Sequence, residues 1–132
     1  MRSIVLLTLG LALLVAVLSA CSSSGASNRP GARIDGIDWR AISVGGLVPP
    51  PDHAPTMTIA ADSIRGSGGC NEYGGKVALD GTRLVATDMQ MTLRACLDDS
   101  ANEVERRFMT ILGARPTIGQ RDGHLILAGA GG

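Results

Sequence analysis

The stretch Gly66-Ser67-Gly68-Gly69-Cys70-Asn71-Glu72-Tyr73-Gly74-Gly75 lies between two β-prone segments of the chain. The preceding segment, 63–69, predicts a strand that loosens into glycine. The following segment, 76–79, predicts a strand with Val77 and Leu79 on one face. Glycine permits bulges, close approach of strands and positive φ angles. The stretch therefore predicts a tight turn over 70–75 between two neighbouring strands.

Strand patterns continue on both sides of this turn. Alternating or β-branched segments, bounded by Gly, Pro and Asp-Gly pairs, predict about five to seven antiparallel strands. Asp80-Gly81 and Asp122-Gly123 are typical of hairpin turns. The Pro-rich segment 45–55 predicts a loop. The expected strands cover 37–43, 56–60, 63–69, 76–79, 83–91, 117–121 and 124–128.

A single amphipathic helix is expected before the last two strands. Asp98, Asp99 or Ser100 can cap its N-terminus, and Gly113 ends it. Its apolar residues recur at helical spacing on one face and are Ala101, Val104, Phe108, Ile111 and Leu112. One such helix with antiparallel strands indicates an α+β domain in which the helix covers a curved sheet.

Residues 1–36 have the composition of a targeting signal followed by a linker. Arg2 precedes an apolar run over 4–20, which ends in Leu18-Ser19-Ala20-Cys21. An aliphatic residue, two small residues and a cysteine match the bacterial lipobox, whose thiol accepts a diacylglyceryl group. We expect a signal peptide over 1–20, a lipidated Cys21 with a flexible tether over 21–36, and a folded domain over 37–132. The alternative is a plain anchor helix that happens to end in cysteine.

These features predict an extracytoplasmic protein held to the cell envelope by its lipid. Ser22, in place of Asp, fits export to the outer membrane if the host has two membranes. The chain carries 12 basic and 12 acidic residues, without the clustered basic surface that nucleic acid requires. We therefore expect a membrane partner and no nucleic acid. We also expect a monomer.

The cysteine count leaves one pair after lipidation of Cys21. The remaining thiols are Cys70 and Cys96, and an even remainder in an oxidising compartment favours a structural disulfide. Free buried thiols or a redox pair are the alternatives, although no Cys-x-x-Cys motif is present. His53 and His124 lack metal-ligand spacing and are expected to be solvated. No metal or cofactor is therefore predicted.

Four segments together resemble the META/HslJ family of bacterial envelope lipoproteins. The stretch 66–75 resembles the family's GxxGCNxYxG signature, and Trp39 lies in the first expected strand, where the family has W-x-L. The segment 92–96, Thr-Leu-Arg-Ala-Cys, resembles the T-x-x-x-C motif. Glu105 with the apolar residues after it resembles the E-x-x-[FY]-x-x-x-L helix. These matches cover nearly the whole chain from residue 37 on.

Membership of this family implies an α+β fold with a partly barrel-like sheet and one helix. It also implies an extracytoplasmic location and a loose association with heat or antibiotic stress, but no settled biochemical activity. The chain departs from the family pattern at Ala41, where a larger aliphatic residue is usual. It also has no further strand after Leu125-Ile126-Leu127, where members often continue. The closing edge of the sheet is therefore expected to differ from that of the family.

The signature residues Asn71, Glu72 and Tyr73 have two interpretations. In the structural one, Asn71 caps its own turn through side-chain hydrogen bonds, and Tyr73 covers the disulfide or a neighbouring strand with its hydroxyl at the surface. In the functional one, the three side chains form a polar rim that recognises a peptide, a glycan or a lipid.

The sequence contains no nucleophile elbow, phosphate loop or acid–base pair, so we expect no enzymatic activity. The leading hypothesis is a lipid-anchored protein that binds or stabilises another envelope component, a protein or a glycan, under stress. The alternative is a small-ligand or lipid carrier that uses the interior of the curved sheet. The first hypothesis predicts a filled core and an exposed patch, and the second predicts a sizeable apolar cavity.

Overall fold

The computed structural model describes residues 33–129. The expected signal peptide, Cys21 and most of the expected tether lie outside the described residues. Within this part of the chain, no helix has the length and hydropathy needed to cross a membrane. The elements in order are β1 (Asp38–Arg40), the 3-10 helix η1 (Pro51–His53), β2 (Thr56–Ala60), β3 (Ser63–Ser67), β4 (Glu72–Asp80), β5 (Arg83–Met91), α1 (Asp99–Gly113), β6 (Thr117–Arg121) and β7 (His124–Ala128).

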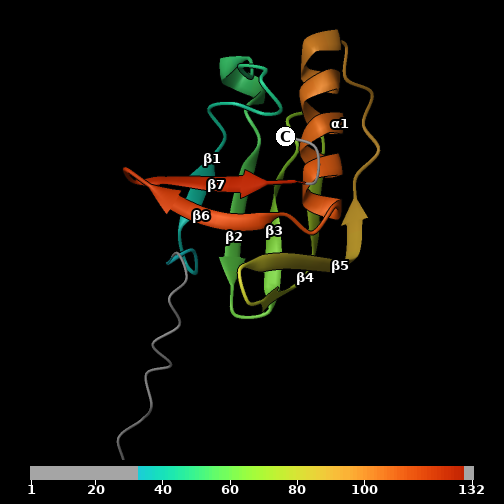
Figure 1. The fold of residues 1–132 in the computed structure, drawn as a ribbon. Coiled ribbons are helices and arrows are strands. Elements are labelled where there is room, and N and C mark those ends of the chain that lie inside the picture. Colours follow the sequence, from blue (N-terminus) through green and yellow to red (C-terminus); the bar gives the residue numbers. More distant parts are fainter. Residues whose placement is uncertain (1–32, 130–132) are drawn as a thin grey trace, which may run out of the picture.

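The seven strands form one antiparallel sheet in which each strand pairs with its neighbours in the chain (Figure 1). Strand β5 pairs with β4 over most of its length, whereas only Arg83 of β5 pairs with Thr117 of β6. Asp88, late in β5, has a positive φ angle of 52°. The sheet bends along β5, and the hairpin of β6 and β7 crosses in front of β1, β2 and β3 in Figure 1.

This bending almost closes the sheet into a barrel. The strand order runs from β1 to β7, and these two edge strands do not pair with each other. The α+β prediction of a curved, mainly antiparallel, barrel-like sheet with one helix is confirmed. The closing edge of the sheet is the open seam between β1 and β7.

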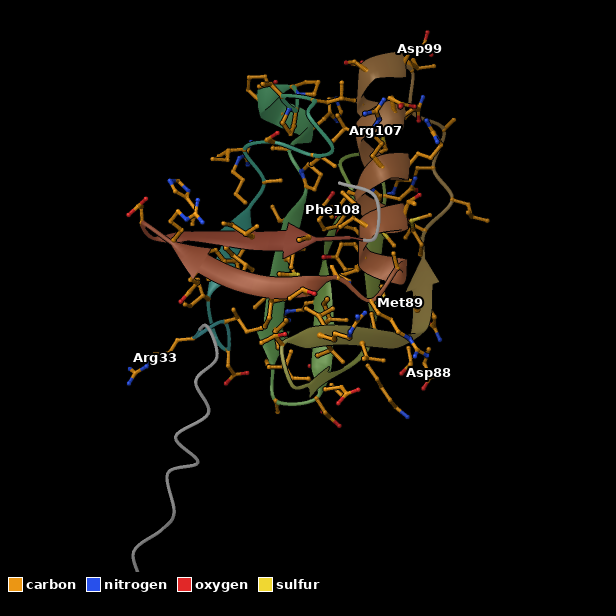
Figure 2. All side chains as sticks on the ribbon, in the orientation of Figure 1. Arg33, Asp88, Met89, Asp99, Arg107 and Phe108 are labelled. Carbon is orange, nitrogen blue, oxygen red and sulfur yellow. A yellow bond between two sulfur atoms is a disulfide. The ribbon has the colours of Figure 1, made fainter. Side chains whose placement is uncertain are left out.

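Helix α1 packs its apolar face onto the sheet. The side chain of Asp98 caps the helix by accepting hydrogen bonds from the backbone N–H groups of Ser100 (2.8 Å) and Ala101 (3.1 Å), as predicted. Phe108 points from α1 toward the strands, and its ring centroid lies 5.8 Å from that of Tyr73 (Figure 2). The buried core that they join includes Met57, Ile59, Ile64, Val77, Leu84, Val104, Leu112 and Ile118. The interior of the sheet is therefore filled with side chains.

Three strands differ in extent from the sequence prediction. Strand β3 ends at Ser67 rather than at residue 69, because the Gly68 N–H already bonds to the Asn71 carbonyl in the turn. Strand β1 ends at Arg40 rather than at residue 43. The Ala41 N–H still donates a hydrogen bond to the Pro55 carbonyl. Proline has no N–H to donate in the opposite direction, so the pairing with β2 stops there. Strand β4 begins at Glu72, inside the predicted turn 70–75, because Glu72 already pairs with Ser67 of β3. The turn itself is therefore shorter than expected.

Candidate functional site

The buried carboxylate of Glu105 fastens the turn between β3 and β4 to helix α1. This turn covers residues 68–71, and we call it the signature turn. Its Oε2 accepts hydrogen bonds from the backbone N–H groups of Cys70 (2.9 Å) and Asn71 (2.6 Å), and its Oε1 accepts one from Asn71 Nδ2 (2.7 Å). Burying a charge is costly unless hydrogen bonds replace water, and these three bonds do so. Gly68 passes so close that a Cβ there would lie 2.8 Å from Glu105 Cγ. This glycine is therefore required by the approach of the carboxylate.

Asn71 also ties the turn to the segment that follows β5. Its Oδ1 accepts hydrogen bonds from the Thr92 hydroxyl (3.0 Å) and from the Arg94 backbone N–H (2.6 Å). The Thr92 hydroxyl in turn accepts a hydrogen bond from the Glu72 backbone N–H at 3.1 Å. One buried asparagine thus holds together the turn, the helix and the irregular segment 92–97.

Tyr73 anchors the start of β4 inside the sheet. Its hydroxyl donates a hydrogen bond to the Thr56 carbonyl at 2.9 Å. A Cβ at Gly66 would lie 2.1 Å from the same carbonyl oxygen, so only glycine fits beneath this contact. Burial, and to a lesser extent the negative charge of Glu72, raises the pKa of the Tyr73 hydroxyl well above its ordinary value. The hydroxyl therefore remains a protonated donor.

Cys70 and Cys96 are joined in a disulfide with their Cα atoms 5.7 Å apart, which is the pairing predicted from the sequence. His53 Nδ1 lies 2.8 Å from the Gly69 carbonyl oxygen, and His53 and the two sulfur atoms lie within 4.8 Å of one another. Because the sulfurs are bonded to each other, they are not free to ligate a metal. His53 is half-buried, so the prediction that it is solvated was wrong, whereas His124 is exposed as predicted.

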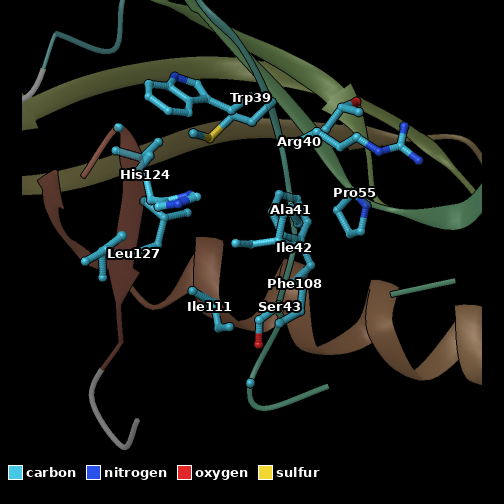
Figure 3. A pocket seen from close by; sticks show the side chains of 17 residues that line it. Trp39, Arg40, Ala41, Ile42, Ser43, Pro55, Phe108, Ile111, His124 and Leu127 are labelled. Atoms are coloured by element: carbon cyan, nitrogen blue, oxygen red, sulfur yellow. The ribbon is translucent and has the colours of Figure 1, made fainter. Parts of the chain in front are cut away.

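A groove opens at the seam where the sheet does not close, and we call it the seam groove. Residues 39–45 and 123–127 form its two walls, and Met57, Phe108 and Ile111 contribute to its apolar floor. Its volume is about 490 Å³. Figure 3 shows Ile42 lying across the opening from Leu127. Among the described residues that line the groove, none is acidic.

The comparison with protein families gives one match that covers most of the chain. The model of the META domain matches residues 32–132. The chain belongs to the META domain family. A search of curated proteins with this META domain chain found no match.

Two solved structures are similar to this META domain. A protein solved by NMR has a TM-score of 0.61 and 24% identity, covering 70% of this chain and 80% of its own. The NMR structure of a protein from Burkholderia xenovorans has a TM-score of 0.53 and 23% identity, covering 71% of this chain and 76% of its own. At these identities the two structures show the shared fold alone.

Two of the three predicted rim residues are interior parts of the META domain. Asn71 is 6% exposed and Tyr73 is 4% exposed, whereas Glu72 has an exposed side chain. The structure therefore does not bring the three side chains to one surface. The structural interpretation also changes in two details. The side chain of Asn71 reaches the helix and the segment 92–97 instead of capping its own turn, and the Tyr73 hydroxyl is buried.

Sequence reasoning missed the role of Glu105 and the seam groove. The available signal for Glu105 was its position, since it falls on the apolar helix face with Ala101, Phe108 and Leu112. The groove left no local signal, because its walls come from opposite ends of the META domain. Cys21, the lipid acceptor predicted from the sequence, lies outside the described residues.

Proposed function

We propose that this protein is a lipid-anchored, extracytoplasmic member of the META domain family, and that its domain binds another envelope component. The seam groove carries the proposal. Its volume of about 490 Å³ and its mainly apolar lining are typical of binding sites. Ile42, on one wall, is 67% exposed although it is a large apolar side chain. Apolar surface of this kind, gathered in a concave site, favours an interaction.

The anchoring half of the proposal is supported by the lipobox that ends at Cys21. The residues between Cys21 and Arg33 would span at most about 40 Å when fully extended. An extended tether of this length would separate the folded domain from the lipid headgroups. In line with the family resemblance, we place the binding activity under heat or antibiotic stress.

The acidic side chains support a non-catalytic role. The Glu105 carboxylate is committed to three hydrogen bonds. The hydrogen bond from the Ser100 hydroxyl is the main cause of the lowered pKa of Asp98, and bonds from Arg106 and Arg107 lower that of Glu103. General acids are usually tuned in the opposite direction, toward neutral pH. These carboxylates are therefore best explained as structural groups.

A lipid or small-ligand carrier is the second candidate, and the apolar lining of the seam groove favours it too. The interior of the sheet is filled by side chains such as Ile64 and Leu84, which are almost fully buried. A carried molecule would therefore have to lie in the seam groove and not in the interior of the sheet.

The test uses two matched variants of the full lipidated protein. Ile42→Asp places a charge inside the groove, and Val48→Asp places one at an 83% exposed site outside its lining. Both proteins would be purified from membranes in mild detergent, and the co-purifying components identified. We expect a component that is retained by the native and Val48→Asp proteins and lost from Ile42→Asp. Equal recovery from all three would contradict binding at the groove, and a bound lipid would favour the carrier.

A further inference from the structure

The register of the last hairpin leaves one edge of β7 without a partner. Arg121 and His124 pair across a two-residue turn in which Asp122 and Gly123 both have positive φ angles. Residues in an antiparallel pair alternately face the partner strand and turn away from it. Because His124 faces β6, Leu125 and Leu127 direct their backbone N–H and C=O groups away from it.

A hydrogen bond on the far side of β6 supports this register. Leu127 lies opposite Ile118, and the Ile118 N–H donates to the Thr82 carbonyl at 2.7 Å, away from β7. The backbone groups of Leu127 therefore point in the opposite direction, toward the seam. Within residues 33–129, no strand pairs with this edge of β7.

The free edge also lacks the usual protection. Natural edge strands are commonly blunted by proline, lysine or a β-bulge. The sequence of β7, His-Leu-Ile-Leu-Ala, has neither proline nor lysine, and its pairing with β6 is continuous over all five residues. The edge lines an apolar groove of about 490 Å³ instead of lying flat against solvent. Such an edge is a template for an added strand.

We infer that the seam groove binds an extended peptide segment of a partner, which adds to the free edge of β7 as a further strand. This inference rests on the proposed binding function and names its ligand class. A peptide can bond to the exposed N–H and C=O groups of Leu125 and Leu127, whereas an acyl chain would cover them without offering a hydrogen bond. Every second side chain of the peptide would point to the floor at Phe108 and Ile111.

The charged side chains at the groove indicate which peptide sequences would bind there. Its titratable lining residues are Arg40 and His124, and no acidic side chain lines it within the described part of the chain. Next to the groove, Arg107 Nη1 donates to the Gly45 carbonyl oxygen at 2.8 Å, but its Nε is paired with Glu103 Oε1 at 2.6 Å, so the positive charge of the groove comes from Arg40. A peptide with apolar residues at alternate positions and an acidic residue among them complements this surface.

The experiment selects ligands from a displayed library of random linear peptides, with the full-length protein purified in mild detergent as the target. We expect the enriched peptides to carry apolar residues at every second position together with an acidic residue. A synthetic copy of an enriched peptide should slow hydrogen exchange at the Leu125 and Leu127 amides about tenfold or more. The Ile126 amide, which faces β6, is the internal control.

Backbone methylation of the same peptide supplies a second readout that leaves the protein unchanged. N-methyl groups on the amides that face β7 should weaken binding about tenfold or more, while N-methyl groups on the alternate amides should weaken it less. Peptides that bind without protecting Leu125 and Leu127, or a library that yields no enriched peptide, would overturn strand addition. The binding function itself fails separately, if the co-purification above finds no groove-dependent component.

Discussion

The Glu105 carboxylate accepts hydrogen bonds from both the backbone N–H and the side-chain amide of Asn71, at 2.6 and 2.7 Å. The two residues are 34 positions apart and belong to different elements. Their contact holds the signature turn against α1, and Asn71 also accepts hydrogen bonds from Thr92 and Arg94. We call this hydrogen-bond network around Glu105 and Asn71 the clasp. The most distinctive part of the sequence is therefore a structural clasp, and the proposed binding surface lies elsewhere.

Replacing Glu105 by glutamine should destabilise the domain by about 2–3 kcal/mol, because the amide loses the charge and turns a donor toward another donor. The free energy of unfolding in urea, measured by circular dichroism, checks this. Glu103→Gln on the same helix is the control; its side chain is 33% exposed and paired with Arg106 and Arg107, and because ion pairs near the surface contribute little, its loss should cost much less stability than Glu105→Gln. Equal stability of the two variants would contradict the clasp.

Replacing Gly68 by alanine should also loosen the clasp. The new Cβ would lie 2.8 Å from Glu105 Cγ, so we expect a loss of about 1–3 kcal/mol from overpacking. Gly119→Ala in β6 is the matched control, since no atom lies within 4 Å of its added Cβ. Thermal unfolding of both variants measures the difference. A Gly68→Ala protein as stable as the control would show that the turn does not press against the helix.

The disulfide should contribute roughly 3–4 kcal/mol to the free energy of unfolding, since it closes a loop between residues 26 positions apart. The Cys70→Ser/Cys96→Ser protein is expected to unfold at correspondingly lower denaturant concentration. Non-reducing peptide mapping of the native protein should recover the two cysteines in one linked pair of peptides. Two alkylatable thiols in freshly isolated protein would contradict the bond.

The capping carboxylate of Asp98 predicts that the stability of the folded domain depends on pH. Its pKa is lowered, mainly by the Ser100 hydroxyl and the Ala101 N–H, so the folded state holds the ionised form more tightly than the unfolded state does. The stabilisation is complete above the unfolded pKa, near 4, and is lost as pH falls through the folded value. Asp98→Ala should therefore lower the melting temperature at neutral pH and matter progressively less in acid. Asp98→Asn, which caps without titrating, should remove this pH dependence.

The proposed lipidation of Cys21 predicts where the protein is found in the cell. Cys21→Ser should abolish incorporation of labelled fatty acid and move the protein from the membrane fraction, whereas Ser22→Ala should leave both unchanged. Cell fractionation with metabolic labelling measures the two effects. A Cys21→Ser protein that still carries labelled acyl chains would contradict the assignment of the acceptor.

The helix and the strand pattern could be predicted because their causes are local. The Asp98 cap, the spacing from Ala101 to Leu112 and the Asp122-Gly123 turn are each encoded within a few residues. The disulfide followed from counting thiols in an expected oxidising compartment. These features depend on the neighbouring sequence and not on the final shape of the sheet.

The clasp and the seam groove depend instead on contacts between distant parts of the chain. The position of Glu105 on the apolar helix face indicates burial, which is unusual for a glutamate, but nothing in the neighbouring sequence indicates that its carboxylate meets Asn71. The exposed rim was predicted from the polarity of Asn71 and Tyr73, and both side chains find their partners inside the fold. The groove likewise arises only after the sheet bends along β5 and brings β7 across β1.

The most direct test of the central claim is photo-crosslinking in living cells from a residue incorporated at position 42, in the seam groove. Position 93, where Leu93 is 91% exposed after β5, serves as the surface control. The proposed function predicts a discrete adduct with one envelope component from position 42 and none from position 93. Adducts from position 93 alone, or no adduct from position 42 at native expression, would contradict the seam groove as the binding surface.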